Sequence, residues 1–422
     1  MQKRYPRKNT LWTNNLKVGN VTLTVALPTF QMRKDMDKMI YMDNAATTKM
    51  TPAVIQAMCL CMENTWYNPS SLYAPAQKAA EALRDARARI AACLNASPDE
   101  IIFTSGGSEA DNQAILSAAR AGSQAGKRHI VSTAIEHHAV LHTLEKLERE
   151  GYEVELLDVP YNGIVSAAQV ERAVRKDTCL VTVMYANNEI GSIQPISEIG
   201  AICREKGVAF HTDAVQAAGH LPIDVKAQNI DLLSLSAHKF HGPKGIGALY
   251  ARKGIPVASL IEGGEQEQGR RAGTENVPAI IGMAVALEES CSHMAENTRK
   301  LTALRDQLIA GLSQIPYSVL NGDPKNRLPG NVNFSFAGIE GESLVLLLNQ
   351  QGICASTGSA CTSHSLLPSH VLLAIGRTDD EALGALRLSL DVNNTQADVD
   401  EVLCAVPEFV RGLRRNRSGV VW

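Results

Sequence analysis

From about residue 76 onward, short apolar segments alternate with segments long enough to form helices. The apolar runs lie at 101–103, 129–131, 154–157, 179–184, 207–210 and 231–235. One intervening segment carries Val140, Leu144 and Leu147 at helical spacing. Strands that alternate with helices in this way form a mainly parallel sheet with helices on both faces. The chain is therefore predicted to have an α/β fold, in which ligands bind at the carboxyl ends of the strands.

The predicted organisation also includes a helix before the first strand and, after residue 296, a different order of helices and strands. Apolar residues spaced by four and three, which share one helical face, are Ala79, Leu83, Ala86, Ile90 and Leu94. After residue 296 come a long helix, a strand at 331–336, a helix near 342–351 and a last strand at 385–390. The predicted domains are a large one at 51–296 and a smaller α+β one made of 39–50 and 297–422.

The composition favours a small-molecule substrate. The chain has 422 residues, of which 45% are hydrophobic and 20% charged, and its formal net charge is -3. Nucleic acid or an anionic membrane as the main partner would favour a strongly basic face. No apolar stretch approaches the roughly 20 residues that span a bilayer, and the N-terminus lacks a secretory apolar core. We expect a cytoplasmic protein that contacts neither nucleic acid nor membrane.

Residues 1–38 are interpreted as an N-terminal extension. They contain eight Lys or Arg against two Asp and show no sustained periodicity. Import into an organelle is disfavoured because the segment is poor in serine and forms no convincing amphipathic helix. We predict a disordered tail, or a true start at Met32, Met36 or Met39.

The cysteines and a histidine pair suggest no intrinsic metal site. Nine cysteines at irregular spacings form neither a disulfide framework nor zinc knuckles, so most are expected to be reduced and buried. Cys179, Cys203 and Cys354 are interpreted as apolar strand residues. His138 and His142 are spaced i, i+4, but no third ligand follows in a metal-like pattern, so we predict no zinc there.

A lysine and an aspartate lie at the ends of two predicted strands. Lys239 ends an apolar strand and enters the glycine-rich loop 241–245, where a Schiff-base lysine would be placed. Asp213 follows the apolar run 208–210 and could keep a pyridine nitrogen protonated, which makes pyridoxal-5′-phosphate (PLP) an electron sink. Taken singly, these residues could equally be a solvated loop lysine and a helix N-cap.

A glycine turn between a predicted strand and helix could hold a phosphate. Gly106 and Gly107 allow close backbone approach, and Ser108 and the first-turn amides can donate to an anion. The same segment could be an ordinary helix start, because Glu109 and Asp111 suit the helix dipole without any ligand.

The combination of motifs is far more specific than its parts. The segments that carry it are Tyr41–Thr48, Thr104–Asn112, Glu136–His137, Asn187–Gly191, Asp213–Gln216, Ser236–Lys239, Arg270–Thr274 and Gly358–Cys361. In this order they resemble cysteine desulfurases of the NifS/IscS type over about residues 40–410. The resemblance implies a PLP-dependent transferase of fold type I, with PLP as cofactor and L-cysteine as substrate.

The resemblance also implies a role for individual residues. Lys239 would form the Schiff base, Asp213 would bind the pyridine nitrogen, and His137 would stack on the ring and shuttle protons. Asn187 and Gln216 would contact the phenolic oxygen of PLP. The positions that match phosphate ligands are Gly107, Ser108, Ser236 and His238. Thr274 matches a residue contributed across a two-fold interface, which implies a homodimer.

Cys361 decides the predicted activity. It lies in the small, polar segment 355–364, which is expected to be exposed and mobile. Mobility suits a nucleophile that takes sulfur as a persulfide and carries it to an acceptor. His364 could assist it. Apart from contact between Cys361 and a nascent iron–sulfur cluster, no metal is expected.

Arg387 interrupts the predicted strand 385–390. An unpaired guanidinium would be costly among apolar residues, so it needs an anion. Its planar fork can hold a substrate α-carboxylate, as the resemblance implies, or it could form an internal salt bridge.

The predicted function is therefore removal of sulfur from L-cysteine, giving alanine and a persulfide on Cys361. The acceptor would be an iron–sulfur scaffold or another sulfur-transfer pathway such as tRNA thiolation. A selenocysteine lyase, an aminotransferase and a non-catalytic interaction protein are the alternatives.

Overall fold

The computed structural model describes residues 16–18, 21–23, 39–358 and 367–416. The chain divides into two compact units, Met1–Lys38 and Met39–Trp422. In the first unit, strand β1 (Leu16–Val18) pairs antiparallel with strand β2 (Val21–Leu23). Alternating apolar residues allow this pairing, and the prediction of a disordered extension stays a prediction. Met32 and Met36 lie outside the described residues.

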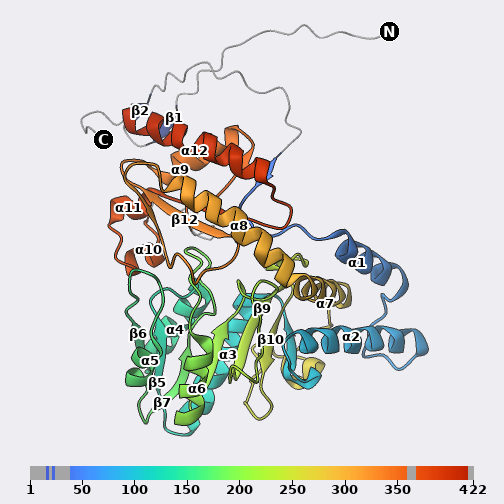
Figure 1. Ribbon diagram of the computed structural model, residues 1–422. Helices are drawn as coiled ribbons and strands as arrows, with labels where there is room; N and C mark the ends of the chain where they lie inside the picture. The colour runs from blue at the N-terminus through green and yellow to red at the C-terminus, as the bar shows by residue number, and fades with distance from the viewer. Residues whose placement is uncertain (1–15, 19–20, 24–38, 359–366, 417–422) are drawn as a thin grey trace, which may run out of the picture. The chain divides into compact units, whose positions relative to one another are not determined.

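A seven-stranded sheet forms the centre of the second unit (Figure 1). Its strands, in spatial order, are β4 (Ile101–Thr104), β10 (Gly247–Ala251), β9 (Leu232–Ser236), β8 (Ala209–Asp213), β7 (Thr178–Thr182), β5 (His129–Thr133) and β6 (Glu153–Leu157). Only β10 runs antiparallel to its neighbours, β4 and β9. The prediction of a mainly parallel α/β sheet is confirmed, and all six predicted strands belong to it. Strand β10, which follows the glycine-rich loop, was not predicted.

Alternate residues of each strand enter two different cores, one on each face of the sheet. On one face, Ile102, Ile130 and Leu180 pack with helices α3 (Gly107–Gln124) and α4 (His138–Arg149). On the other, Phe103 and Val131 join residues of α2 (Ala74–Cys93), α5 (Ala167–Ala173), α6 (Ile196–Lys206) and α7 (Val277–Ser292). Except for the edge strand β6, the strands are buried on both faces, which explains their continuous apolar runs.

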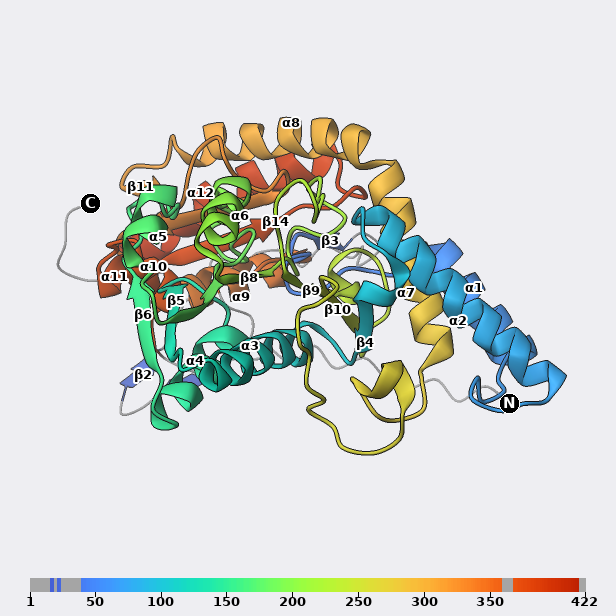
Figure 2. The same cartoon turned by 90° about the horizontal axis from the view of Figure 1, so that it is seen from below.

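Helices α1 (Pro52–Asn64), α2 and α7 lie side by side (Figure 2). The predicted apolar face of α2 is buried at all five positions, Ala79, Leu83, Ala86, Ile90 and Leu94. Close approach of α1 and α7 depends on Gly282, because a Cβ there would lie 2.8 Å from the sulfur of Met58.

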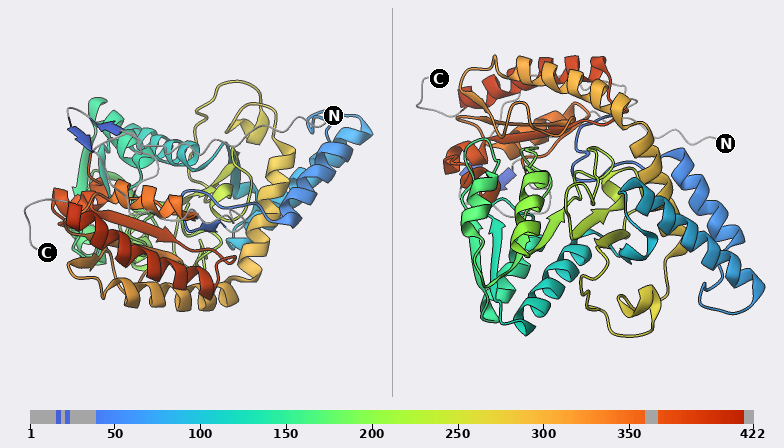
Figure 3. Two further views of the ribbon diagram at one scale, coloured as in Figure 1. Left: turned by 90° about the horizontal axis from the view of Figure 1, so that it is seen from above. Right: turned by 60° about the horizontal axis from the view of Figure 1, so that its bottom comes forward.

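A second sheet contains β11 (Ser318–Leu320), β12 (Asn331–Phe336) and β14 (Ala385–Ser389). Helices α8 (Met294–Leu312) and α12 (Gln396–Asn416) lie against each other beside it, as Figure 3 shows. With α9 (Gly341–Gln350) they enclose a separate core, which also takes up Ile40 and Met42 of the segment that contains β3 (Ile40–Tyr41). The predicted strands at 331–336 and 385–390 are confirmed.

The remaining elements connect these layers. They are β13 (Ile353–Cys354), which pairs with β3, and helices α10 (His370–Ala374) and α11 (Asp379–Leu383). The division into domains at 51–296 and at 39–50 with 297–422 stays a prediction. Within the described residues, no helix is long and apolar enough to cross a membrane.

The cysteines only partly follow the prediction. Cys179 and Cys354 lie in strands β7 and β13, but Cys203 lies in helix α6, so its assignment to a strand was wrong. Cys59 and Cys404 are exposed, and of the eight described cysteines only Cys61, Cys179 and Cys203 are buried. Burial of most cysteines was therefore also a wrong prediction. None of the described cysteines forms a disulfide.

Candidate active site

The predicted site residues of the large sheet follow the carboxyl ends of its strands. Gly107 and Ser108 come after β4, His137 after β5, and Asn187 after β7. Asp213 ends β8, and Lys239 ends the short 3-10 turn Ala237–Lys239 after β9. Because β4, β5, β7, β8 and β9 all run in one direction, these ends meet at one edge of the sheet.

Lys239 points to the segment that precedes α1. Its Nζ donates hydrogen bonds to the carbonyl oxygens of Ala45 at 2.5 Å and Ala46 at 2.8 Å. The amide of Gln216 donates to the same Ala45 oxygen at 3.0 Å. The segment 43–49 therefore closes over the lysine and joins it to the residues after β8.

His137 and two buried carboxylates form a cluster at this edge. One ligand atom each of Asp111, His137 and Asp213 lies within 4.8 Å of the others. Asp111 Oδ1 is buried and accepts no hydrogen bond within the described part of the chain, although His211 Nε2 lies 3.6 Å away. Asp213 Oδ1 accepts the Val215 N–H at 2.9 Å. The cluster is short of positive charge.

Burial determines the charge states of this cluster. It raises the pKa of Asp213 to about 6, opposed by the Val215 N–H and the Lys239 ammonium. Burial raises the pKa of Asp111, and the nearby Asp213 carboxylate raises it further. Burial and the Lys239 charge lower the pKa of His137 to about 4. His137 is therefore neutral near pH 7, and since its Nδ1 accepts the Ala139 N–H at 3.1 Å, its proton is on Nε2.

The glycine turn after β4 packs closely on the ends of β8 and β9. A Cβ on Gly107 would lie 2.6 Å from Val215 Cγ2 and 3.5 Å from Ser236 Cβ. Ser236 is buried, whereas Ser108 is exposed at the first turn of α3. His238 Nδ1 lies 3.2 Å from the Thr47 hydroxyl, and burial followed by the Lys239 charge lowers its pKa to about 4.

Asn187 and Thr274 are placed differently from the other predicted residues. The amide of Asn187 donates to the Ile135 carbonyl at 2.9 Å, and its oxygen accepts the backbone N–H groups of Glu189 and Ile190. Its side chain therefore holds its own loop in shape. Thr274 is exposed in the loop before α7.

Arg387 reaches the site from β14 and is almost fully buried. Its guanidinium pairs with Asp43 Oδ1 at 3.0 Å and donates to the Asn188 carbonyl at 3.0 Å. Its Nε has no hydrogen-bond partner among the described residues. The internal salt bridge that the sequence left open is thus present, and an unused N–H remains.

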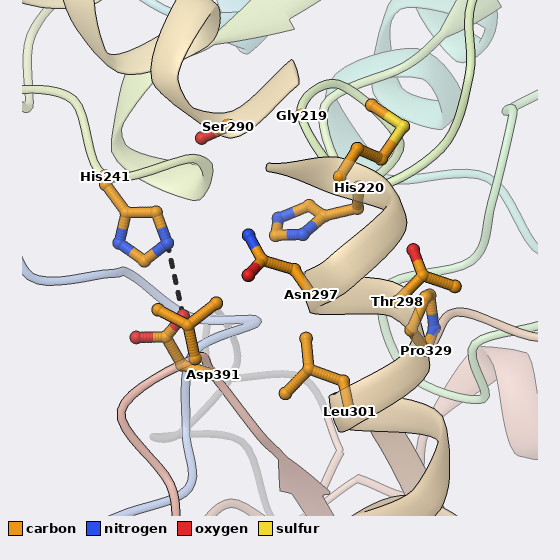
Figure 4. Close-up of a pocket in the computed structure, with 11 residues that line it drawn as sticks. Gly219, His220, His241, Ser290, Asn297, Thr298, Leu301, Pro329 and Asp391 are labelled. Carbon is orange, nitrogen blue, oxygen red and sulfur yellow. Dashed lines mark ion pairs between the residues drawn. The ribbon is translucent and has the colours of Figure 1, made fainter. Parts of the chain in front are cut away.

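A second buried ion pair lies near the Lys239 loop (Figure 4). His241 Nε2 lies 3.1 Å from Asp391 Oδ1, at the edge of a pocket lined also by His220, Asn297 and Thr298. His220 Nε2 donates to the Lys239 carbonyl at 2.9 Å. Histidines thus hold the lysine loop on both sides.

A third imidazole joins the histidine pair of α4. The ring of His370 lies 4.6 Å from that of His138, which lies 5.1 Å from that of His142. His370 is remote in sequence, so the pattern in α4 alone could not reveal it. Among the described residues, the only three His, Cys, Asp or Glu side chains whose metal-ligating atoms all lie within 4.8 Å of one another are those of Asp111, His137 and Asp213. Cys361 and His364 lie outside the described residues.

Sequence reasoning missed the partners of the predicted residues. Asp43 and Glu136 were part of the quoted motifs but received no role, and Asp111 was assigned only to the helix dipole. Glu136 is fully buried, and burial raises its pKa to about 8. The available signal was the acidic residue within each motif, because a buried carboxylate needs a partner.

Comparisons with known proteins identify the family to which this chain belongs. The family model for "Aminotransferase class-V" matches residues 40–402. A relative named "Cysteine desulfurase IscS" from Clostridium botulinum is 52% identical over 390 residues, which cover 92% of this chain and 98% of the relative. This chain belongs to the cysteine desulfurase family. A second cysteine desulfurase IscS, from Methanosarcina thermophila, is 54% identical over 378 residues, covering 90% of this chain and 93% of the relative.

Solved structures support the same assignment to the cysteine desulfurases. A structure named "NIFS-LIKE PROTEIN" aligns with a TM-score of 0.84 and 37% identity, covering 89% of this chain and all of the other. Another, "SspA in complex with cysteine", aligns with a TM-score of 0.74 and 38% identity, covering 83% and 98%. The chain thus spans nearly the full length of both.

The desulfurase family is PLP-dependent, and the described residues fit that cofactor. Buried Asp213 and Asp111 have raised pKa values, and one Asp111 oxygen accepts no hydrogen bond from the described residues, which suits a protonated pyridine ring. Gly107 begins helix α3 and packs against Val215 too closely for a Cβ, and a helix N-terminus of this kind can bind a phosphate through its first-turn amides. Lys239 supplies the amine.

Proposed function

We propose that this desulfurase takes sulfur from L-cysteine as a persulfide on Cys361 and releases alanine. The observation that carries the proposal is the likeness to cysteine desulfurases, 52% over 98% of the Clostridium botulinum relative. Because the likeness spans the whole enzyme, it supports the complete reaction. The similar SspA structure, named as a complex with cysteine, supports the same substrate.

PLP, when bound, supplies an electron sink for charge that develops at the substrate α-carbon. Asp213, buried at the end of β8, would hold a proton on the ring nitrogen when PLP is bound. Lys239 Nζ takes the α-proton, since its place beside the carbonyls of Ala45 and Ala46 keeps it at the mouth of the cluster. His137 is neutral and carries its proton on Nε2. It can donate this proton to the departing product and take a proton up again.

Arg387 binds the substrate α-carboxylate. Its buried Nε has no hydrogen-bond partner among the described residues and could donate to an anion, while another N–H of the guanidinium donates to the Asn188 carbonyl. Asp43 already neutralises part of the guanidinium charge, so an arriving carboxylate either shares Arg387 with Asp43 or displaces it. Substrate binding therefore changes the ion pair between Arg387 and Asp43.

Cys361 takes the sulfur. Its thiolate forms an S–S bond with the substrate sulfur while the bond between that sulfur and the substrate Cβ breaks. The electron pair of the broken bond stays with the carbon fragment, which takes up a proton and leaves as alanine. Cys361 then carries the sulfur as a persulfide for a thiol acceptor.

The remaining assignments concern partners and location. Thr274, exposed before α7, fits a residue that completes the phosphate site of a second copy, so the active unit is a homodimer. Ser108, Ser236 and His238 would share the same phosphate. The acceptor is an iron–sulfur scaffold, as the IscS name of the relatives suggests, or a tRNA-thiolation enzyme, in the cytoplasm.

The direct test is to supply the PLP-loaded protein with L-cysteine and a thiol reductant and to measure alanine and sulfide. We expect the two in equal amounts. Formation of pyruvate, or of a keto acid that needs an amino acceptor, would contradict the proposal. Much faster turnover of selenocysteine would instead identify a selenocysteine lyase.

A further inference from the structure

The ion pair between His241 and Asp391 joins two parts of the site that are far apart in sequence. His241 lies two residues after Lys239, and Asp391 lies just after β14, which carries Arg387. Both side chains are buried, with 10% and 8% of their surface exposed. Figure 4 shows the imidazole of His241 directed at the carboxylate of Asp391 on one side of the pocket, with the ion pair drawn as a dashed line. A buried pair of this kind must be matched closely in geometry.

The hydrogen bonds of His241 determine its protonation state. Its Nδ1 lies 3.1 Å from the Lys49 carbonyl oxygen, which can only accept, so Nδ1 carries a proton. Its Nε2 lies 3.1 Å from the Asp391 carboxylate, an acceptor of the same kind. With both nitrogens as donors, the ring is an imidazolium. The neutral ring would lose one of the two contacts.

The backbone of His241 is held in an unfavourable conformation. Its φ is +67°, in the left-handed region that residues other than glycine rarely adopt. The N–H donates to the Thr48 hydroxyl at 2.7 Å, and that hydroxyl also donates to the His238 carbonyl at 2.9 Å. Such a conformation persists only where the surrounding contacts fix it, and here they fix the turn that ends in Lys239.

These contacts close a ring through the site. From Lys239 the chain runs to His241, which pairs with Asp391; β14 then leads back to Arg387. Arg387 pairs with Asp43, and two residues later the Ala45 carbonyl accepts from Lys239. The lysine and the arginine are thus linked on two sides, once through segment 43–49 and once through the His241–Asp391 pair.

We propose that His241 and Asp391 are positioning residues that fix the distance between Lys239 and Arg387, and that this link opens when His241 loses its proton. The inference rests on the proposed function, which gives Lys239 and Arg387 their roles. When the His241–Asp391 pair is intact, the guanidinium of Arg387 lies at a distance from Lys239 that L-cysteine can span. When the ion pair breaks, β14 can shift, and Arg387 then binds the substrate carboxylate less tightly.

The charges around His241 set the direction of the pH dependence. Burial alone would lower its pKa, but the hydrogen bond and charge of Asp391, the Lys49 carbonyl and the Glu289 carboxylate raise it above the usual range. His220, the other titratable group facing the pocket, has its pKa lowered by burial and stays neutral near pH 7. Since the folded state raises the pKa of His241, the link is complete at low pH and is lost as pH rises through that pKa.

The pair itself is tested by titrating the His241 imidazole of the holoenzyme by NMR, with its signal assigned from His241→Gln. We expect a pKa above that of an ordinary histidine, and a drop of about one unit or more in Asp391→Asn. An unchanged pKa in Asp391→Asn would overturn the inference. This measurement needs no turnover, so it stands even if the protein fails to desulfurate L-cysteine.

The positioning role is tested with L-alanine, the expected product, which has a carboxylate but no thiol to titrate. Its dissociation constant from the holoenzyme is followed by the visible spectrum. At about pH 6 we expect Asp391→Asn to bind L-alanine about tenfold more weakly than wild type. Above the pKa of His241 the two proteins should converge. Equal affinities at low pH, or a ratio that does not change with pH, would refute the positioning role.

Glu155→Gln is the matched control. Glu155 Oε2 lies 3.5 Å from the buried His129 on strands β6 and β5, remote from the Lys239 loop. Its removal alters a histidine–carboxylate pair without touching the ring of contacts, so L-alanine binding should follow wild type at every pH. If Asp391→Asn does not fold, His241→Gln provides the same comparison, because an amide can donate only from one end.

Discussion

The two halves of the active site balance their charges in opposite ways. At the edge of the seven-stranded sheet, buried carboxylates gather without a guanidinium, and burial raises the pKa of Asp213 to about 6 and of Glu136 to about 8. At the end of the three-stranded sheet, each buried charge has a partner, Arg387 with Asp43 and His241 with Asp391. The charges of the first half need a protonated ligand, whereas the charges of the second half are already paired and only one N–H of Arg387 is left without a partner among the described residues.

This difference explains what each half binds. A cluster short of positive charge favours a protonated pyridine ring, which stays in place during the reaction. In the proposed function, the guanidinium paired with Asp43 takes a further carboxylate, which suits a substrate that must arrive and leave. The permanent ligand thus belongs to the charge-deficient half and the transient ligand to the balanced half.

Lys239→Ala should break the first half most severely. Without the amine, proton removal from the substrate loses its base, and we expect alanine formation to fall by at least about 10³-fold. Alanine yield and the visible absorbance of the lysine-bound cofactor measure this. Lys244→Ala, in the same loop, is the control and should keep both. Persistence of either signal in Lys239→Ala would exclude this lysine.

Arg387→Lys should weaken the second half. A lysine keeps the charge but loses the planar fork, so we expect KM for L-cysteine to rise about 100-fold with a much smaller change in kcat. Steady-state kinetics measure the split. Arg252→Lys, which alters a pair with Asp231 at the far end of β9, should leave KM unchanged. A fall in kcat with constant KM would show that Arg387 does not bind the carboxylate.

Glu136→Gln should sharpen the contrast in charge balance. Because burial raises the pKa of Glu136 from 4.5 to about 8, the folded state prefers the protonated form, and wild-type stability falls as pH rises between these values. Glutamine keeps the oxygen that accepts from Thr133 and Met184 and never ionises. Urea unfolding should show the variant gaining about 3 kcal/mol on wild type between pH 5 and pH 8. A difference independent of pH would contradict the raised pKa.

Gly107→Ala should have the smallest effect. The new Cβ would lie 2.6 Å from Val215 Cγ2, so the valine must move or the turn must open, at a cost of about 1 kcal/mol. We expect PLP affinity to fall about fivefold, measured by equilibrium dialysis. Gly412→Ala, where a Cβ meets nothing within 4 Å, is the control. Tighter PLP binding in Gly107→Ala would argue against a phosphate at this turn.

The first half could be predicted from the sequence because its residues follow strand ends. Alternation of strands and helices fixes the sheet, and parallel strands bring their carboxyl ends to one edge, so Asp213 and Lys239 could be placed together. Strand β10 was missed because a short apolar run after a glycine loop gives no periodicity. Cys203 was misplaced because a short apolar stretch does not distinguish a strand from a buried helix face.

The second half could be predicted only in part. An arginine within an apolar strand signals a need for an anion, but Asp43 lies 344 residues away in sequence. The same holds for Asp391 opposite His241, and for His370 against His138. Long-range pairs of side chains depend on how two sheets pack, and no local pattern records that.

The central claim is that Cys361 receives the sulfur. The most direct measurement compares Cys361→Ala with Cys354→Ala, a cysteine of strand β13, after the PLP-loaded proteins react with L-cysteine without reductant. Intact-mass spectrometry should show one added sulfur atom on wild type and on Cys354→Ala but none on Cys361→Ala, which also forms no alanine. An added sulfur atom together with normal alanine production in Cys361→Ala would contradict the account.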